Sequence, residues 1–338
     1  MQKAFITGLA GYEMSADERA FIDAERPAGL ILFTRNCAGA EQIRSLVAQF
    51  KIAAGTEDVL VLVDQEGGRV QRLKPPLARL LPPAAAYLAH YNGDIEAACR
   101  AAFAVARLTA DDLTTLGINT NCAPVLDVPV PGAHDIIGNR AYAPDSPTII
   151  RLGRAVAGGL MAGGVLPVIK HIPGHGRAMA DSHLELPVVD ASREQLAGSD
   201  FAPFAALNDL PAAMTAHVVF TSLDPRQPAS TSREVTTTII RGKLGFKDLL
   251  MSDDLSMKAL TGTFEERTRA VLEAGSDLAL HCNGHLDEMQ SVARAAPPLA
   301  GPAHARFMRA LAVTRKLVQP YDIQAAEAVL AELLVPMS

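Results

Sequence analysis

The chain has 338 residues, of which 49% are hydrophobic and 20% are charged, and its formal net charge is -6. This length and hydrophobic content suit one large α/β barrel with a buried core, and they exclude a disordered chain. The acidic balance and the lack of a basic run argue against a nucleic-acid partner, because binding phosphates requires clustered Lys and Arg. We therefore expect a small molecule as the partner.

Four cysteines, Cys37, Cys99, Cys122 and Cys282, are scattered without a short-spaced pair. This spacing is typical of reduced thiols rather than of a disulfide framework or a zinc knot. The N-terminal stretch has one lysine followed by a short apolar segment that glycines interrupt, and no apolar run in the sequence is long enough to span a membrane. We expect a soluble, cytoplasmic, monomeric protein without a membrane partner.

Short apolar runs alternate with helical segments along the chain. The candidate strands are residues 4–7, 29–33, 59–63, 118–123, 165–169, 212–216, 249–251 and 277–280. The runs at 59–63 and 165–169 are continuously apolar, which predicts burial on both faces, as in a parallel sheet covered by helices. Eight strands are the number that a closed (β/α)8 TIM-type barrel requires. No repeat or linker divides the sequence, so we predict a single barrel domain over residues 1–338 and no second α/β domain.

The helices between these runs carry start signals. Capping-box spacing occurs at Ser15 with Glu18, at Ser192 with Gln195 and at Thr231 with Glu234. Ser146 followed by Pro147 predicts an N-cap and a first helical residue.

Ionisable side chains end several of the predicted strands. Asp64 ends the third strand, Lys170 and His171 the fifth, His217 the sixth and Asp253 the seventh. In (β/α)8 barrels the active site is built at the carboxyl ends of the strands. A single strand-end aspartate could instead cap the next helix, but endings of this kind on separate strands predict an active site.

The stretch KHIPGHGRAMADSH, residues 170–183, combines histidines, a lysine and an aspartate with the turn-forming residues Pro173, Gly174 and Gly176. This composition is typical of an active-site loop. Its side chains could alternatively bind zinc through His171, His175, Asp181 and His183. The stretch lacks the helical H-E-x-x-H pattern and a paired C-x-x-C, so we expect no metal.

Two acidic motifs follow strands. Asp253 and Asp254 are adjacent, and because successive strand side chains alternate between faces, at most one of them should project into the barrel mouth. Asp64 belongs to DQEGGRVQR, in which Arg72 follows a glycine pair. A carboxylate beside a guanidinium can grip sugar hydroxyls or a carboxylate, although a surface salt bridge uses the same residues.

The motifs VDQEGGRVQR, KHIPGHGRAMADSH, MTAHV and MSDDLSM, in this order, resemble the single-domain β-N-acetylglucosaminidases of glycoside hydrolase family 3. The resemblance covers most of the chain, from residue 31 to residue 280. Ile172 stands where Phe is commoner in the family, and Asn139 stands where the family has Asp in the motif IGDRSF.

The resemblance implies a retaining exo-glycosidase that uses no cofactor. It places the nucleophile at Asp253 and the acid/base at His183 with Asp181 as its partner. Histidine can protonate the leaving oxygen because it is partly charged near neutral pH. The implied substrate contacts are Asp64, Arg72, Arg140, Lys170 and His171, with His217 as a neighbour of the site.

The implied substrate is a carbohydrate: terminal N-acetylglucosamine on 1,6-anhydro-N-acetylmuramyl peptides, which are released during peptidoglycan recycling. Hydroxyl-binding groups alone do not report a 2-acetamido pocket, so a β-glucosidase or a glycoside phosphorylase of the same family is an alternative. A metal-dependent hydrolase and a non-catalytic sugar-binding barrel are further alternatives.

Overall fold

The computed structural model describes residues 1–182 and 185–335. Its main sheet contains β1 (Lys3–Thr7), β2 (Pro27–Leu32), β3 (Leu60–Val63), β6 (Thr120–Asn121), β7 (Leu166–Pro167), β8 (Ile169–Ile172), β10 (Ala212–Thr215), β12 (Leu249–Asp254) and β13 (Leu278–His281). Neighbouring strands follow the order β7-β6-β3-β2-β1-β13-β12-β10-β8, and they pair in parallel.

The sheet is closed by the chain itself. β7 and β8 stand at the two ends of the strand order, but Val168 alone separates them in sequence, so they are two parts of one barrel strand. β7 pairs with β6, and β8 pairs with β10. The predicted (β/α)8 barrel is therefore confirmed, and each predicted strand has a counterpart. The fifth strand is longer than predicted, since β8 contains both Lys170 and His171.

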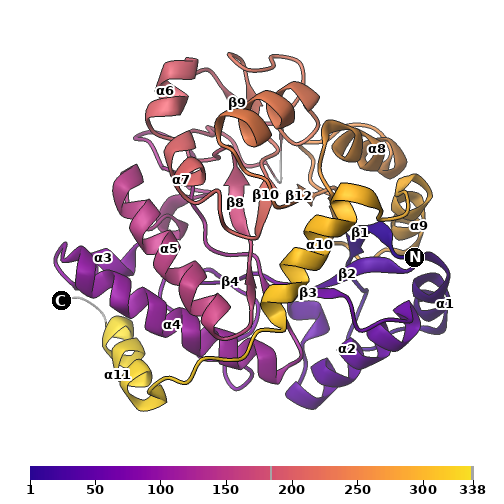
Figure 1. Cartoon of the computed structure of the whole chain (residues 1–338), viewed down its shortest axis with the longest axis horizontal. Helices are drawn as coiled ribbons and strands as arrows, with labels where there is room; N and C mark the ends of the chain where they lie inside the picture. Colours follow the sequence, from indigo (N-terminus) through magenta and orange to yellow (C-terminus); the bar gives the residue numbers. More distant parts are fainter. Residues whose placement is uncertain (183–184, 336–338) are drawn as a thin grey trace.

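Helices surround the barrel (Figure 1). They are α1 (Ala16–Glu25), η1 (Thr34–Asn36), α2 (Ala40–Ala54), α3 (Ala86–His90), α4 (Ile95–Thr115), η2 (Gly138–Arg140), α5 (Ser146–Ala162), α6 (Arg193–Gly198), α7 (Phe201–Ala206), η3 (Val235–Lys243), α8 (Phe264–Ala274), α9 (Leu286–Ala295), α10 (Gly301–Thr314) and α11 (Ile323–Leu334). Short strand pairs lie outside the barrel: β4 (Gln65–Gly67) with β5 (Val70–Gln71), and β9 (Val188–Val189) with β11 (Val219–Phe220).

The strands separate two hydrophobic layers. Leu60 and Leu62 of β3 belong to the cluster inside the barrel, whereas Val61 and Val63 belong to the cluster between the sheet and the helices. Both layers exclude water, which explains why this segment is continuously apolar. Phe307 of α10 joins the inner cluster, so α10 covers one end of the barrel.

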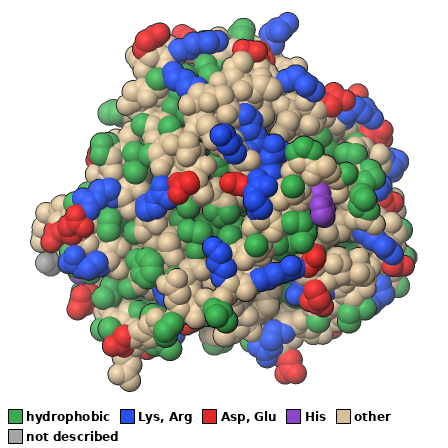
Figure 2. Space-filling view, viewed as in Figure 1, with side chains coloured by type: hydrophobic (Ala, Val, Ile, Leu, Met, Phe, Trp, Pro, Cys, Tyr) green, Lys and Arg blue, Asp and Glu red, His purple; other side chains and the backbone are tan. Residues whose placement is uncertain are grey.

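The face that α10 crosses carries charges of both signs. Figure 2 shows a short group of basic side chains near the middle of this face, with acidic side chains beside it and hydrophobic ones around it. Arg306 and Arg309 of α10 form ion pairs with Asp277 and Asp248, at 2.7 and 2.8 Å. These pairs fix α10 to the segments that enter β13 and β12.

The predicted helix caps are partly confirmed. Capping boxes are present at Ser15 and at Ser192. The prediction for Thr231 is wrong, because the Oγ of Ser232 accepts from the backbone N–H of Val235.

The prediction that Ser146 is an N-cap is also wrong. Asp145 caps α5 by accepting from Thr148, and the Ser146 hydroxyl instead donates to the carbonyl of Ser199. The stronger acceptor one residue earlier therefore takes the cap.

Within the part of the chain that the structure describes, no helix combines the length and apolarity needed to cross a membrane.

Candidate active site

A pocket with a volume of about 550 Å³ opens at the carboxyl ends of the barrel strands. Its wall includes Asp64 after β3, Lys170 and His171 of β8, and Asp253 of β12. Arg140 of η2 completes the wall from the loop that follows β6. The structure thus brings together polar residues that the sequence places on separate strands.

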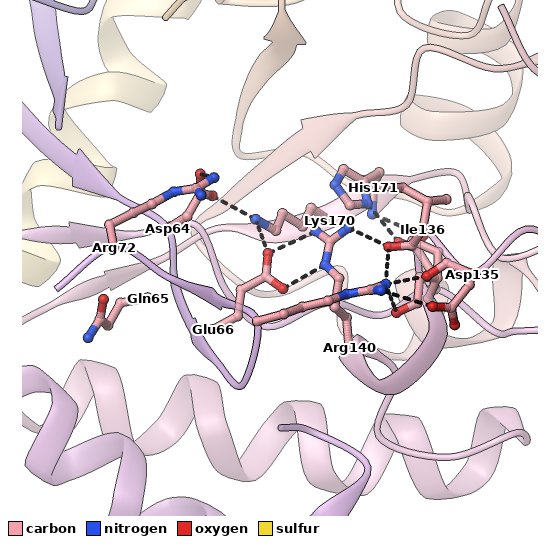
Figure 3. A network of polar contacts seen from close by, with 12 residues as sticks. Asp64, Gln65, Glu66, Arg72, Asp135, Ile136, Arg140, Lys170 and His171 are labelled. Carbon is pink, nitrogen blue, oxygen red and sulfur yellow. Dashed lines mark hydrogen bonds and ion pairs between the residues drawn. The ribbon is translucent and has the colours of Figure 1, made fainter. Parts of the chain in front are cut away.

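A network of ion pairs forms one side of the pocket (Figure 3). The Lys170 ammonium lies 2.9 Å from Asp64 Oδ1 and 2.6 Å from Glu66 Oε1. Arg72 Nη2 donates to Asp64 Oδ2 at 3.1 Å. Arg140 donates to both oxygens of Glu66, through Nε and Nη2, at 2.8 Å each. The two carboxylates therefore hold three cations at fixed positions.

These groups are ionised at neutral pH. Burial alone would raise the pKa of Asp64 and of Glu66, but the adjacent Lys170 offsets this effect, with help from Arg72 at Asp64 and from Arg140 at Glu66, and both pKa values lie below their ordinary values. Burial opposes the charge on Lys170, yet Asp64 and Glu66 raise its pKa above the ordinary value. The ion-pair network therefore contains three cations and two carboxylates, and it carries one net positive charge.

The backbone around the hairpin β4–β5 fixes Asp64, Glu66 and Arg72. Gln65 lies between the two acidic residues and is buried, and its side chain exchanges hydrogen bonds with the backbone of Leu73. Its backbone N–H and C=O pair with the Asn121 side chain of β6. The acidic side chains therefore stand on a rigid turn.

Asp253 and Asp254 both border the pocket, contrary to the prediction that only one does. The pairing register between β12 and β13 shifts between Met251 and Asp254, so regular alternation is lost there. Asp254 Oδ1 accepts from the backbone N–H groups of Ser256 and Cys282, which ties this carboxylate to the protein.

Asp253 is less constrained. Among the described residues, its carboxylate accepts a hydrogen bond only from the backbone of Asp254, at 2.8 Å, and it forms no ion pair. Burial would raise the pKa of Asp253, but His171 and His217 offset this and hold it below the ordinary value. The pocket therefore contains an ionised carboxylate whose second oxygen has no partner among these residues.

His171 stands between the pocket and a buried aspartate. Its Nδ1 lies 2.6 Å from Asp127 Oδ2. The other oxygen of Asp127 accepts from the backbone N–H groups of His171 and His175, at 3.1 and 2.7 Å. Burial raises and His171 lowers the pKa of Asp127, and the net result is below its ordinary value.

His217 does not border the pocket. Its ring is fully buried, with Nδ1 2.7 Å from Ser230 Oγ and Nε2 3.0 Å from the carbonyl oxygen of Asp254. Burial lowers the pKa of His217, and its Nε2–H donates to the carbonyl oxygen of Asp254. The structure places His217 behind the strand end, as a support for its backbone.

The loop after β8 returns to the pocket at Ser182. The Ser182 hydroxyl lies 3.1 Å from His175 Nε2, and the Ser182 carbonyl accepts from the backbone of Ala259 at 3.3 Å. Burial and the neighbouring His171 lower the pKa of His175 to about 4. Asp181 precedes Ser182 and is partly buried. The predicted acid/base, His183, lies outside the described residues.

Sequence reasoning missed Glu66 and Asp127. Glu66 lies inside the quoted motif DQEGGRVQR, but it follows the strand end by three residues and its role appears only when Arg140 is brought to it. Asp127 lies four residues beyond the predicted fourth strand, so the rule that identified Asp64 directly at a strand end does not reach it. Among residues 1–182 and 185–335, no group of three or more His, Cys, Asp or Glu side chains has the geometry to hold a metal ion.

Comparison with known proteins shows the family of this chain. The profile described as "Glycosyl hydrolase family 3 N terminal domain" matches residues 3–312. The β-hexosaminidase of Alkalilimnicola ehrlichii is 38% identical over 294 residues, covering 86% of this chain and 83% of that protein. The β-hexosaminidase of Chromobacterium violaceum is 36% identical over 337 residues, covering 97% of this chain and 93% of its own.

Solved structures are similar over nearly the whole chain. NagZ from Neisseria gonorrhoeae in complex with N-trifluoroacetyl-D-glucosamine has a TM-score of 0.87 and 32% identity, with 99% of both chains covered. A family 3 β-N-acetylglucosaminidase from Paenibacillus has a TM-score of 0.85 and 29% identity, covering 96% of this chain and 66% of that one. With the profile match and the curated relatives, these likenesses show that the chain belongs to glycosyl hydrolase family 3, as its motifs predict.

Proposed function

We propose that this protein is a retaining exo-β-N-acetylglucosaminidase that removes terminal N-acetylglucosamine. The observation that carries the proposal is Asp253, an ionised carboxylate at a barrel strand end with an oxygen that no described residue engages. The relatives named β-hexosaminidase and the NagZ structures support the sugar specificity.

In the first half of the reaction Asp253 attacks the anomeric carbon. A bond forms between a carboxylate oxygen and C1, and the bond from C1 to the glycosidic oxygen breaks through an oxocarbenium-like transition state. His183 gives its proton to the departing oxygen, and Asp181 orients the imidazole. In the second half, water gives a proton to His183 and attacks C1, which releases Asp253 and a sugar of unchanged anomeric configuration.

The ion-pair network supplies sugar-binding groups. Asp64 accepts from two cations, so its charge is balanced and its remaining lone pairs can accept sugar hydroxyls. Lys170 is buried, Arg140 is partly buried and Glu66 holds both, so they are positioned before the substrate arrives. We propose that the terminal sugar is bound by five side chains: Asp64, Arg72, Arg140, Lys170 and His171. For His217 we propose a supporting role, in which its ring holds the backbone carbonyl of Asp254 in place.

A single pocket rather than an open cleft suits an exo-acting enzyme. A volume of about 550 Å³ suits one sugar and part of the next. We propose that the natural substrate is a cytoplasmic N-acetylglucosaminyl-1,6-anhydro-N-acetylmuramyl peptide from peptidoglycan recycling, cleaved by a monomer whose single domain spans residues 1–338.

Turnover of 4-nitrophenyl β-N-acetylglucosaminide and of the matching glucoside tests the sugar specificity. We expect rapid release from the first and much slower release from the second, independent of added phosphate. Purified anhydro-muropeptides and long chitin test the exo-action in parallel. Preference for the glucoside, a requirement for phosphate, or release of internal chitin fragments would contradict the proposal.

A further inference from the structure

Asp127 is a buried carboxylate whose hydrogen-bond partners, among the described residues, are His171 and His175. It has no exposed surface, and no Lys or Arg among the described residues forms an ion pair with it. A buried carboxylate is strongly destabilising unless hydrogen bonds or an opposite charge compensate it. Two backbone amides and one imidazole provide that compensation here.

The two oxygens of Asp127 have different tasks. Oδ1 accepts from the backbone N–H groups of His171 and His175, and so fixes the start of the loop after β8. Among the described residues, Oδ2 has a hydrogen-bond contact only with the His171 ring, 2.6 Å from Nδ1. Fixing the loop requires Oδ1 alone, so the second contact is not explained by loop structure.

The contact at Oδ2 determines which nitrogen of His171 carries the proton. An ionised carboxylate can only accept, so Nδ1 must be protonated. Nε2 is then the nitrogen of this pocket-lining ring that remains for a ligand. The ring of His175 packs edge-on against His171, with centroids 5.6 Å apart, and restricts its rotation.

We infer that Asp127 is a positioning residue that fixes the tautomer and orientation of His171, so that Nε2 is presented to a hydroxyl of the bound sugar. This inference rests on the proposed function, because it assumes that His171 contacts the sugar. Asp127 itself touches no substrate. Carboxylates that orient a functional histidine in this way also occur behind metal-bound and catalytic imidazoles.

Asp127→Asn separates the two tasks of the carboxylate. The amide oxygen can still accept from both backbone N–H groups, whereas the amide nitrogen then donates toward His171 Nδ1. His171 must accept at Nδ1 and carry its proton on Nε2, the opposite tautomer. Nitrogen-15 spectra of histidine-labelled protein, at a pH where the ring is neutral, report this change directly. The signals that disappear in the His171→Gln variant are those of the His171 ring nitrogens.

We expect a protonated Nδ1 in the unchanged protein and a protonated Nε2 in Asp127→Asn. An unprotonated Nδ1 in the unchanged protein would overturn the inference without any variant at Asp127. An unchanged tautomer in folded Asp127→Asn would overturn it as well.

Kinetics provide the second test. Asp127→Asn should lower kcat/KM for the nitrophenyl N-acetylglucosaminide by about 10- to 100-fold, the loss typical when the outer partner of an oriented histidine is removed. If Asp127 acts through His171, the double variant with His171→Gln should be no slower than His171→Gln alone. Losses that multiply in the double variant would show an independent role and refute the inference.

Asp277→Asn is the matched control for neutralising a buried aspartate. Asp277 pairs with Arg241 and Arg306 at the other end of the barrel, so its loss should lower stability and leave kcat/KM of the folded enzyme unchanged. Failure of the proposed function is recognised separately, by absent turnover in the unchanged enzyme. The tautomer measurement needs no activity and decides the inference in either case.

Discussion

Asp253 and Asp254 are adjacent in the chain but have different surroundings. Asp254 is tied to Ser256 and to the backbone of Cys282, whereas Asp253 accepts only from its neighbour's N–H among the described residues. A carboxylate that the protein already engages is a poor nucleophile, because attack requires it to leave its partners. This contrast supports Asp253 as the nucleophile.

Asp253→Ala should therefore lower kcat by several orders of magnitude. It should change stability little, because the substitution removes one side chain at the pocket and a single hydrogen bond, from the N–H of Asp254. Asp254→Asn should lower the free energy of unfolding by about 1 to 3 kcal/mol, since its partly buried hydrogen bonds are weakened. Mass spectrometry after treatment with a slow fluorinated sugar should show one adduct, on Asp253. An adduct on Asp254 would contradict the assignment.

The proposed acid/base predicts a dependence on the leaving group. His183→Ala should slow glycosides with poor leaving groups far more than activated aryl glycosides, which need little protonation. Asp181→Asn should show a milder form of the same pattern. The exposed His304 on α10 is a control, and His304→Ala should leave both substrates unaffected. Equal losses on both substrate classes in His183→Ala would argue against the proposed role.

At the scale of elements, the strands could be predicted because each is a run of buried apolar residues between polar ends. The fourth was predicted at 118–123 but forms only Thr120–Asn121, because the side chains of Asn119 and Asn121 bond to the backbone of the β3 segment and its hairpin. The pairing of Glu66 with Arg140 could not be predicted, since 74 residues separate them and only the closed barrel brings them together.

Two loops at the pocket depend on each other through Gly176. A Cβ at this position would lie 1.9 Å from the carbonyl oxygen of Val128, and the backbones of His134 and Ala178 are hydrogen-bonded nearby, at 2.9 Å. The loop that begins at Asp127 therefore packs directly on the loop that leads to Ser182. A side chain at Gly176 would force the two apart.

Gly176→Ala should lower the free energy of unfolding by about 1 to 3 kcal/mol, as overpacking does, and should also reduce kcat/KM because both loops line the pocket. Gly198→Ala is the control, since a Cβ there meets no atom within 4 Å. Chemical denaturation and steady-state kinetics of both variants measure the two effects. A Gly176→Ala protein as stable and active as Gly198→Ala would disprove the contact.

His175 should make stability depend on pH. Burial and His171 lower its pKa to about 4 in the folded protein, from an unfolded value of 6.5. Between these values the unfolded chain binds a proton that the folded protein does not, so this contribution to stability is complete above about pH 6.5 and is lost as the pH falls. Among the described residues, the titratable groups that act on the ring are His171, Asp127 and Asp253.

His175→Gln removes this titration. Between about pH 7 and pH 5, its free energy of unfolding should fall less than that of the unchanged protein. Denaturation curves at several pH values measure the two slopes. Parallel slopes would mean that His175 titrates alike in the folded and unfolded states.

On the scale of the whole molecule, stability and chemistry are divided between the two ends of the barrel. The pocket stands at the carboxyl ends of the strands, while α10 packs Phe307 into the inner cluster and is tied down by its arginines. Figure 1 shows α10 crossing the barrel, while the C-terminal helix α11 lies away from it beside α4. A substitution in the core under α10 should therefore lower the free energy of unfolding and leave substrate binding unchanged.

Phe307→Ala tests this division. The side chain is fully buried, so its removal should lower the free energy of unfolding by about 3 to 5 kcal/mol and reduce Tm. Phe103 on α4 is 40% exposed, and Phe103→Ala should be much less destabilising. Both variants should keep the KM of the unchanged enzyme at temperatures where they are folded, because neither residue borders the pocket. A raised KM in folded Phe307→Ala would mean that the barrel transmits changes from α10 to the substrate site, and that its inner cluster is part of the catalytic apparatus as well as of the core.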